Sequence, residues 1–224
     1  MKRDVGHTDD EEEFWASERR GMVADLQGYG IRDQRIRDAM GKVRRHLFIP
    51  DGCRFHEDAY ADHATPIGLG QTISQPYIVA YMIDRLELKP GESVLEIGAG
   101  SGYQAAVLAE LGARVYTVEL IPALAQHARE VLAREGYAER VEVLTGDGSL
   151  GWPERAPFDA IVGACAAADE PTALEAQLKE GGRFLFPVGG PGSQRLVFIR
   201  KTGGRLIRKN DLPVLFVPLV KGKS

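Results

Sequence analysis

Residues 94–104 read VLEIGAGSGYQ, and this stretch decides the fold. It begins with an apolar run broken by one glutamate, which is typical of a buried strand. Gly98, Gly100 and Gly102 follow at alternate positions, so we expect a sharp turn from the strand into a helix. Such a loop brings backbone N–H groups close to a bound ligand. The stretch therefore predicts a ligand-binding α/β fold.

Alternating patterns on both sides of this loop support that interpretation. Strands are expected at 93–97, 114–119, 141–146, 158–163 and 183–188, and helices at 101–111, 122–135 and 172–180. This alternation is typical of parallel strands joined by crossover helices, so we expect a doubly wound, mostly parallel sheet. Near the C-terminus, RLVFIRK, a Gly203-Gly204 turn and the apolar VLFVPLV predict an antiparallel pair closing the sheet edge.

The N-terminal part of the chain has a different pattern. Residues 1–13 end in the run DDEEE and are expected to be an acidic, flexible tail. A helix is expected from Glu13 to Gln27, with Phe14 on its apolar side, and Asp33 can cap a second helix. Residues 44–74 look irregular.

The domain organisation follows from these patterns. We expect a single domain over residues 14–224, in which residues 14–74 carry the N-terminal helices and a glycine-rich loop. Residues 75–224 form the α/β core, which opens with a helix after Pro76.

Composition excludes several classes of function. The formal net charge is -4 at pH 7, which argues against a nucleic-acid partner. No stretch approaches the roughly 18 apolar residues of a membrane span, and the N-terminus lacks the apolar segment of a signal peptide. Cys53 and Cys165 fit reduced thiols, so a cytoplasmic protein is expected. The five histidines show no metal-ligand spacing, so no metal site is expected.

Three acids stand at the ends of expected strands, where open α/β sheets bind ligands. Glu96 suits a cationic ligand better than a pyrophosphate, and a dinucleotide fingerprint would need a glycine in place of Tyr103. Glu119 is placed to accept hydrogen bonds from a ribose diol, and Asp147 or its neighbouring backbone to meet an adenine amino group. These features predict a site for S-adenosylmethionine. The residues expected to hold the core of that ligand are Glu96, Gly98, Gly100, Gly102, Glu119, Leu120, Asp147 and Gly148.

A block of glycines and small hydroxyl side chains between two prolines precedes this site: PIGLGQTISQP, at residues 66–76. With LEIGAGSGYQAAVLAEL, VYTVEL, TGDG, PFDAIV, LKEGGRFLFPVG and FVPL, it resembles the protein-L-isoaspartate O-methyltransferase family from about residue 29 to residue 219. The heptapeptide GQTISQP is the most specific part, because generic methyltransferases share the glycine loop but not that segment.

The resemblance implies a class I S-adenosylmethionine-dependent methyltransferase fold. Its activity would be methylation of the free carboxylate of isoaspartyl residues in damaged proteins and peptides, with D-aspartyl acceptors left open. The methyl ester then collapses to a succinimide, which hydrolyses partly back to aspartate. Ser74 takes the active-site role by this resemblance, and Thr72 and Ile73 lie in the loop over the cofactor. A monomer is expected.

Other interpretations remain open on the sequence. Ser74 could instead cap the helix that opens at Pro76, or do both. The acceptor could be a normal aspartate in a dedicated peptide, or the chain could be a module that binds the cofactor without turnover. The segment 164–168 lacks the Asn or Asp followed by Pro-Pro and an aromatic residue that base-amine methyltransferases carry, and Cys165 is expected to be a small buried residue rather than a nucleophile.

Overall fold

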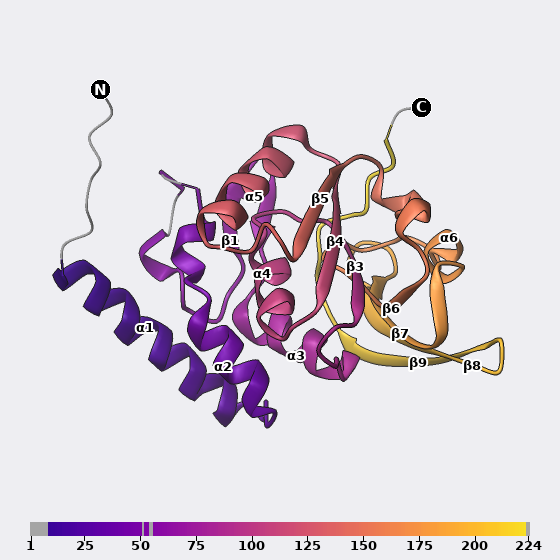
Figure 1. Ribbon diagram of the computed structural model, residues 1–224, viewed down its shortest axis with the longest axis horizontal. Helices are drawn as coiled ribbons and strands as arrows, with labels where there is room; N and C mark the ends of the chain where they lie inside the picture. The colour runs from indigo at the N-terminus through magenta and orange to yellow at the C-terminus, as the bar shows by residue number, and fades with distance from the viewer. Residues whose placement is uncertain (1–8, 51, 54–55, 223–224) are drawn as a thin grey trace.

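The computed structural model describes residues 9–50, 52–53 and 56–222. A seven-stranded sheet crosses its centre in the order β5-β4-β3-β6-β7-β8-β9 (Figure 1). The strands are β3 (Ser93–Ile97), β4 (Arg114–Glu119), β5 (Val141–Thr145), β6 (Phe158–Gly163), β7 (Leu178–Val188), β8 (Arg195–Thr202) and β9 (Arg205–Pro213). Strands β3 to β7 pair in parallel, whereas β8 and β9 add in antiparallel fashion. The expected fold class is confirmed.

Helices cover both faces of this sheet. They are α1 (Asp9–Gly28), α2 (Gln34–Lys42), α3 (Pro76–Leu86), α4 (Tyr103–Glu110), α5 (Pro122–Arg134) and the short α6 (Thr172–Glu175), with 3-10 turns at Arg45–Phe48, His56–Asp58, Gly148–Leu150 and Pro153–Arg155. Figure 1 shows α4 and α5 on one side of the sheet and α6 on the other, with α1 and α2 as an outer layer. Within the described residues, no helix is long and apolar enough to cross a membrane.

The core divides into two clusters along the sheet. Val94 and Val115 belong to the cluster that packs under α1 to α5, whereas their neighbours Leu95 and Tyr116 belong to the cluster that includes Leu174 of α6. This split follows from the two-residue repeat of a strand, which sends successive side chains to opposite faces. Because both faces are covered, the strands read as nearly continuous apolar runs.

The strand order reverses at the centre of the sheet. The chain builds outward from β3 through β4 to β5, and then returns to place β6 on the other side of β3. At such a switch point the loops after the two central strands diverge and leave a crevice at their carboxyl ends. The residues after β3 and β6 are therefore the ones positioned to hold a ligand.

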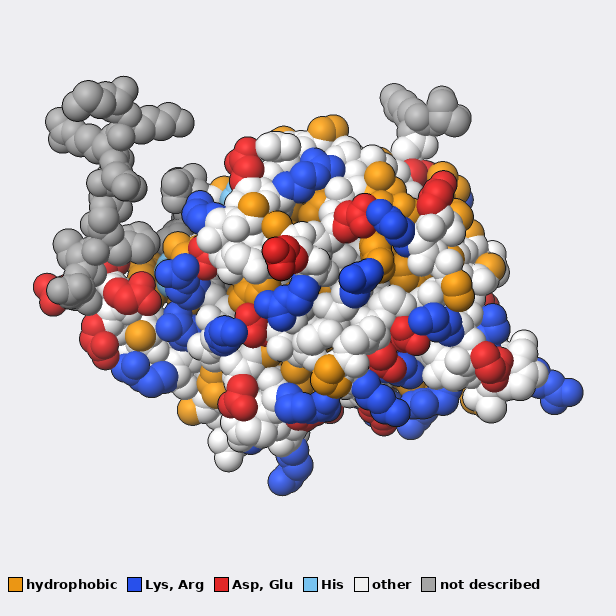
Figure 2. All heavy atoms as spheres, in the orientation of Figure 1, with side chains coloured by type: hydrophobic (Ala, Val, Ile, Leu, Met, Phe, Trp, Pro, Cys, Tyr) orange, Lys and Arg blue, Asp and Glu red, His pale blue; other side chains and the backbone are white. Residues whose placement is uncertain are grey.

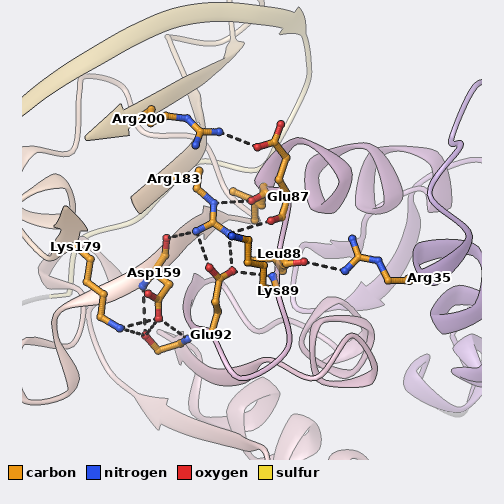
Figure 3. Close-up of polar contacts among 11 residues, drawn as sticks. Arg35, Glu87, Leu88, Lys89, Glu92, Asp159, Lys179, Arg183 and Arg200 are labelled. Carbon is orange, nitrogen blue, oxygen red and sulfur yellow. Dashed lines mark hydrogen bonds and ion pairs between the residues drawn. The ribbon is translucent and has the colours of Figure 1, made fainter. Parts of the chain in front are cut away.

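A network of ion pairs closes the opposite, amino-terminal ends of the central strands (Figure 3). Arg183, at the centre of Figure 3, donates to the Leu86 carbonyl at 2.7 Å, the Asp159 carbonyl at 3.1 Å and the Glu92 carboxylate at 2.6 Å. Lys179 pairs with the Asp159 carboxylate at 2.7 Å. The network joins α3, β3, β6 and β7, so it fixes the end of the sheet remote from the crevice.

The N-terminal region corrects two expectations. Residues 9–13 are not a tail but the first turns of α1, since acidic side chains stabilise the positive end of a helix dipole; residues 1–8 of the expected tail lie outside the described residues. Phe14 is 49% exposed, whereas Trp15 is buried against the His46 ring at a centroid distance of 4.6 Å. The capping role of Asp33 is confirmed, because its carboxylate accepts from the Arg35 N–H.

Three further segments differ from the expected pattern. Residues 44–74 are not wholly irregular, because β1 (Thr65–Gly68) and β2 (Gln71–Ile73) form an antiparallel hairpin. The helix expected at 172–180 ends at Glu175, and β7 begins at Leu178, which pairs with Phe158 of β6. The partner of β8 is β9, so the apolar VLFVPLV forms no strand of the sheet.

Candidate functional site

A cleft lies at the carboxyl ends of β3, β4 and β6 and holds about 850 Å³ free of protein atoms, including space open to solvent. It is the crevice expected at the switch point. Nine of the predicted site residues line it: Thr72, Ile73, Ser74, Glu96, Gly98, Gly100, Glu119, Leu120 and Gly148. Segments far apart in the sequence, the GQTISQP hairpin and the glycine loop, thus meet in one cavity.

The glycine loop is held open by Glu119. One carboxylate oxygen accepts from the Gly100 N–H at 2.9 Å and the other from the Ile121 N–H at 2.9 Å. Each oxygen keeps a second lone pair, so Glu119 can still accept hydrogen bonds from a ligand in the cleft. Gly98 adopts a φ of 92°, a conformation that favours glycine, and this turn carries the chain away from β3.

Glu96 lies fully buried at the floor of the cleft. Its Oε2 accepts from the Thr117 hydroxyl at 2.6 Å, whereas its Oε1 and the nearby Gln104 Nε2 have no hydrogen-bond partner. Burial raises the pKa of Glu96 to about 8, although Thr117 and Gln104 act to lower it, and the charge of Glu119 raises it further. Both unpartnered atoms are shielded from solvent, and Gln104 is close enough to act on Glu96, so this pair forms a buried polar base beneath the glycine loop that is retained at a cost in stability.

Two predicted residues lie outside the cleft lining. Gly102 has a φ of 86°, and a side chain there would come within 3.3 Å of Leu132, so this glycine allows α4 and α5 to pack closely. The Asp147 carboxylate accepts from the Ser149 N–H at 2.8 Å and from the Gly222 N–H at 2.9 Å. Partial burial acts to raise the pKa of Asp147, but these hydrogen bonds outweigh it and hold the pKa below its usual value. The neighbouring Gly148 does line the cleft.

The GQTISQP hairpin joins this cleft to a second cavity. Thr72 and Ser74 line both, and the second is walled by apolar side chains that include Ile78, Leu212 and Phe216. Ser74 does not cap α3, because Asp62 accepts from the Tyr77 N–H at 2.8 Å instead. Among the described residues the Ser74 hydroxyl has no hydrogen-bond partner, so it is free to bind a group that enters from the second cavity.

Sequence reasoning missed one wall of the cleft. Val217, Pro218, Leu219 and Val220 line it, although their apolar sequence looked like a strand. The signal that could have revealed them is proline, since Pro213 precedes the run VLFVPLV, Pro218 lies within it, and proline disrupts a strand ladder.

Cys165, which follows β6, also lines the cleft. Burial, followed by the charges of Glu119 and Glu96, raises the pKa of its thiol to about 12. A thiol in that state is a poor nucleophile, in agreement with the expectation of a small buried residue.

Charge on the outer surface is mixed. Lys and Arg side chains are interspersed with Asp and Glu over the face shown in Figure 2, and no single-sign region dominates it.

Comparisons with known proteins agree with this geometry. A relative from Methylorubrum populi, a protein-L-isoaspartate O-methyltransferase, is 51% identical over 208 residues, covering 92% of this chain and 96% of the relative. A protein of the same name from Chlorobaculum tepidum is 52% identical over 205 residues, covering 91% and 94%. A Plasmodium falciparum structure described as this type of enzyme, in complex with S-adenosyl-L-homocysteine, superposes with a TM-score of 0.80 at 25% identity, covering 91% of this chain and 99% of that one.

A family model covers nearly the whole chain as well. The model described as protein-L-isoaspartate(D-aspartate) O-methyltransferase matches residues 17–224, which include the hairpin, the glycine loop and the wall at 217–220. The chain belongs to the protein-L-isoaspartate(D-aspartate) O-methyltransferase family.

Proposed function

We propose that this protein transfers the methyl group of S-adenosylmethionine to the free carboxylate of isoaspartyl residues in damaged proteins and peptides. One observation carries the proposal: Thr72 in the hairpin and the unpartnered Ser74 hydroxyl just after it stand between two cavities. The first, the polar cleft, contains the carboxyl groups of Glu96 and Glu119, and the second, the apolar cavity, is walled mainly by aliphatic and aromatic side chains. A donor in the first and an acceptor in the second would meet at that hairpin. Methylation of the carboxylate permits closure to a succinimide, which hydrolyses partly back to aspartate.

The residues of the cleft fit the donor. S-adenosylmethionine supplies an activated methyl group when bound. The free lone pairs of Glu119 suit a ribose diol, and Glu96 supports the cleft from beneath the glycine loop. Gly98 and Gly100 allow close approach of backbone at the turn, and Leu120 and Gly148 line the remaining wall. Thr72 and Ile73 would lie over the bound donor.

The acceptor chemistry needs little from the protein. An aspartyl-type carboxylate has a pKa near 4, so it is ionised at neutral pH and needs no general base. Ser74 donates one hydrogen bond to that carboxylate and so orients one oxygen toward the methyl group. Positioning and exclusion of water can supply roughly 7–11 kcal/mol in well-oriented reactions. We assign Ser74 as the catalytic residue and give the apolar cavity to the acceptor chain.

The proposal includes a setting for the enzyme. Cys165 is buried and outside any disulfide, which fits a reducing compartment such as the cytoplasm. One chain supplies both cavities, so a monomer suffices for the reaction.

Replacement of Ser74 tests the assigned role. Ser74→Ala should lower kcat on an isoaspartyl peptide about 10- to 100-fold, the range for one hydrogen bond to a charged group. The Kd for S-adenosylhomocysteine, measured by calorimetry, should stay unchanged. Ser17→Ala on the exposed side of α1 is the matched control and should behave as wild type. A parallel loss of cofactor affinity in Ser74→Ala would make Ser74 a cofactor ligand instead.

A further inference from the structure

Residues 214–222 form a segment that leaves β9 and crosses the carboxyl edge of the sheet; we call it the C-terminal strap. Val214, Leu215 and Phe216 line the apolar cavity, Leu219 and Val220 line the polar cleft, and Val217 lines both. The strap makes no strand of the sheet, and the bridge that pairs it, between Ala166 and Pro218, is an isolated one. What fixes it must be found in its other contacts.

Gln194 holds the end of the strap beside the apolar cavity. This side chain precedes β8 and is only 6% exposed. Its Oε1 accepts from the Phe216 N–H at 2.6 Å, and its Nε2 donates to the Phe216 carbonyl at 3.1 Å. Its own carbonyl accepts from the Val214 N–H at 3.1 Å. One amide group thus satisfies both backbone groups of a residue that no strand pairs.

Asp147 holds the other end, beside the polar cleft. Its Oδ2 accepts from the Gly222 N–H at 2.9 Å, while its Oδ1 accepts from the Ser149 N–H. A side chain on Gly222 would lie 3.2 Å from the Asp147 Cβ and 3.6 Å from Leu120, a predicted cofactor contact. The strap therefore rests directly on the loop after β5.

Backbone hydrogen bonds hold the middle of the strap to the loop after β6. The Ala166 N–H donates to the Val217 carbonyl at 2.8 Å, and the Leu219 N–H donates to the Ala166 carbonyl at 2.7 Å. These bonds join backbone groups only and involve no side chain. They divide the strap into two halves: one beside the apolar cavity, held by Gln194, and one beside the polar cleft, held by Asp147.

We propose that Gln194 and Asp147 are positioning residues that set the two halves of this strap independently, Gln194 for the acceptor peptide and Asp147 for S-adenosylmethionine. The proposal rests on the donor and acceptor cavities assigned above. It gives Asp147 a role through Gly222 in place of a direct contact with adenine.

The test measures the KM for an isoaspartyl peptide and the Kd for S-adenosylhomocysteine in variants at each end of the strap. Gln194→Ala should raise the KM for an isoaspartyl peptide about tenfold, as expected for two lost hydrogen bonds, and leave the Kd for S-adenosylhomocysteine unchanged. Gln194→Glu keeps an oxygen that accepts from the Phe216 N–H but loses the amide N–H that donates to the Phe216 carbonyl. Its KM should therefore lie between those of wild type and Gln194→Ala. Gln126→Ala, an exposed glutamine on α5, is the matched control.

Asp147→Ala and Gly222→Pro should show the opposite split. Each should weaken S-adenosylhomocysteine binding, measured by calorimetry, by about two- to tenfold, the range for one hydrogen bond, with peptide KM unchanged. Gly222→Pro removes the N–H that Asp147 accepts and leaves the Asp147 carboxylate in place. Gly222→Ala is its matched control, because it keeps the N–H and adds the Cβ that would lie 3.2 Å from the Asp147 Cβ. Equal losses of both substrates in every variant, or wild-type binding by Gly222→Pro, would overturn the proposal. If the wild-type protein bound S-adenosylhomocysteine but methylated no isoaspartyl peptide, the proposed function would fail while the binding arm still tested the strap.

Discussion

At the amino ends of β3, β6 and β7, the buried Arg183 guanidinium donates to carbonyls and to both oxygens of Glu92, and Lys179 neutralises Asp159 (Figure 3). At the carboxyl ends of β3 and β4, Glu96 is buried deeper, yet one of its oxygens has no partner and no basic side chain pairs with it among the described residues. Charges are thus paired at the amino ends of the strands, which we call the amino edge. At their carboxyl ends, the carboxyl edge, a buried carboxyl group keeps one oxygen without a hydrogen-bond partner.

This difference separates stability from function. A buried ion pair with its hydrogen bonds complete resists opening, and loss of one member leaves an uncompensated charge. An unpartnered buried carboxyl group is retained at a cost in stability, which a ligand can repay on binding. Changes at the amino edge should therefore act on unfolding, and changes at the carboxyl edge on ligand binding or turnover.

The largest effect on stability is expected at the amino edge. Arg183→Met should lower the free energy of unfolding by about 3–5 kcal/mol, because it leaves Glu92 without its buried partner. Urea unfolding gives this value, and calorimetry on the folded fraction should give an unchanged Kd for S-adenosylhomocysteine. Arg200→Met removes an exposed pair with Glu87 and should cost less than about 1 kcal/mol. A loss of less than about 1 kcal/mol in Arg183→Met as well would contradict the claim that the amino ends of the strands carry stability.

A pH-dependent effect is expected at the carboxyl edge. The pKa of Glu96 is about 8 in the folded protein against an ordinary value of 4.5. Between these values the unfolded chain loses its proton and the folded one keeps it, so the contribution of Glu96 to stability is present below pH 4.5 and is lost as pH rises through 8. Urea unfolding at pH 5, 7 and 9 should show wild type losing stability with pH relative to Glu96→Gln. Parallel curves for the two proteins would contradict the burial argument.

The smallest effect compares two glycines that both have positive φ. Gly98 (φ 92°) follows β3 in the cleft, and Gly112 (φ 85°) lies against Pro90 near the amino edge. Alanine at either position should cost about 1–2 kcal/mol of stability, the penalty for a left-handed residue with a side chain. Only Gly98→Ala should also weaken S-adenosylhomocysteine binding. Equal binding by the two variants would show that the glycine loop does not contact the ligand.

The features best predicted from sequence are those with a strong local cause. The strands around the glycine loop carry continuous apolar runs, and the acids at their ends fall at one edge by topology alone, so Glu96 and Glu119 reach the cleft together. The resemblance of GQTISQP to the family placed Ser74 in the site. The hairpin was missed because β1 and β2 have only four and three residues, and β1 contains Pro66 and Gly68.

The remaining differences depend on tertiary contacts. Leu174 and Leu178 have helical spacing, yet Leu178 pairs with Phe158 in the sheet. VLFVPLV has the composition of a strand, but its position is set by Gln194 and by the Ala166 backbone, both distant from it in sequence. Asp147 illustrates the same limit, because its carboxylate meets the Gly222 N–H, a donor that no local pattern indicates.

Methyl transfer from labelled S-adenosylmethionine to a short peptide with one isoaspartate, beside the same peptide with normal aspartate, tests the central claim most directly. The account predicts label in the isoaspartyl peptide alone, and loss of most of it in Ser74→Ala. Label in the aspartyl peptide would favour a dedicated aspartyl acceptor. Label in neither peptide, with S-adenosylhomocysteine still bound, would contradict the assignment of the carboxyl edge as an isoaspartyl methylation site.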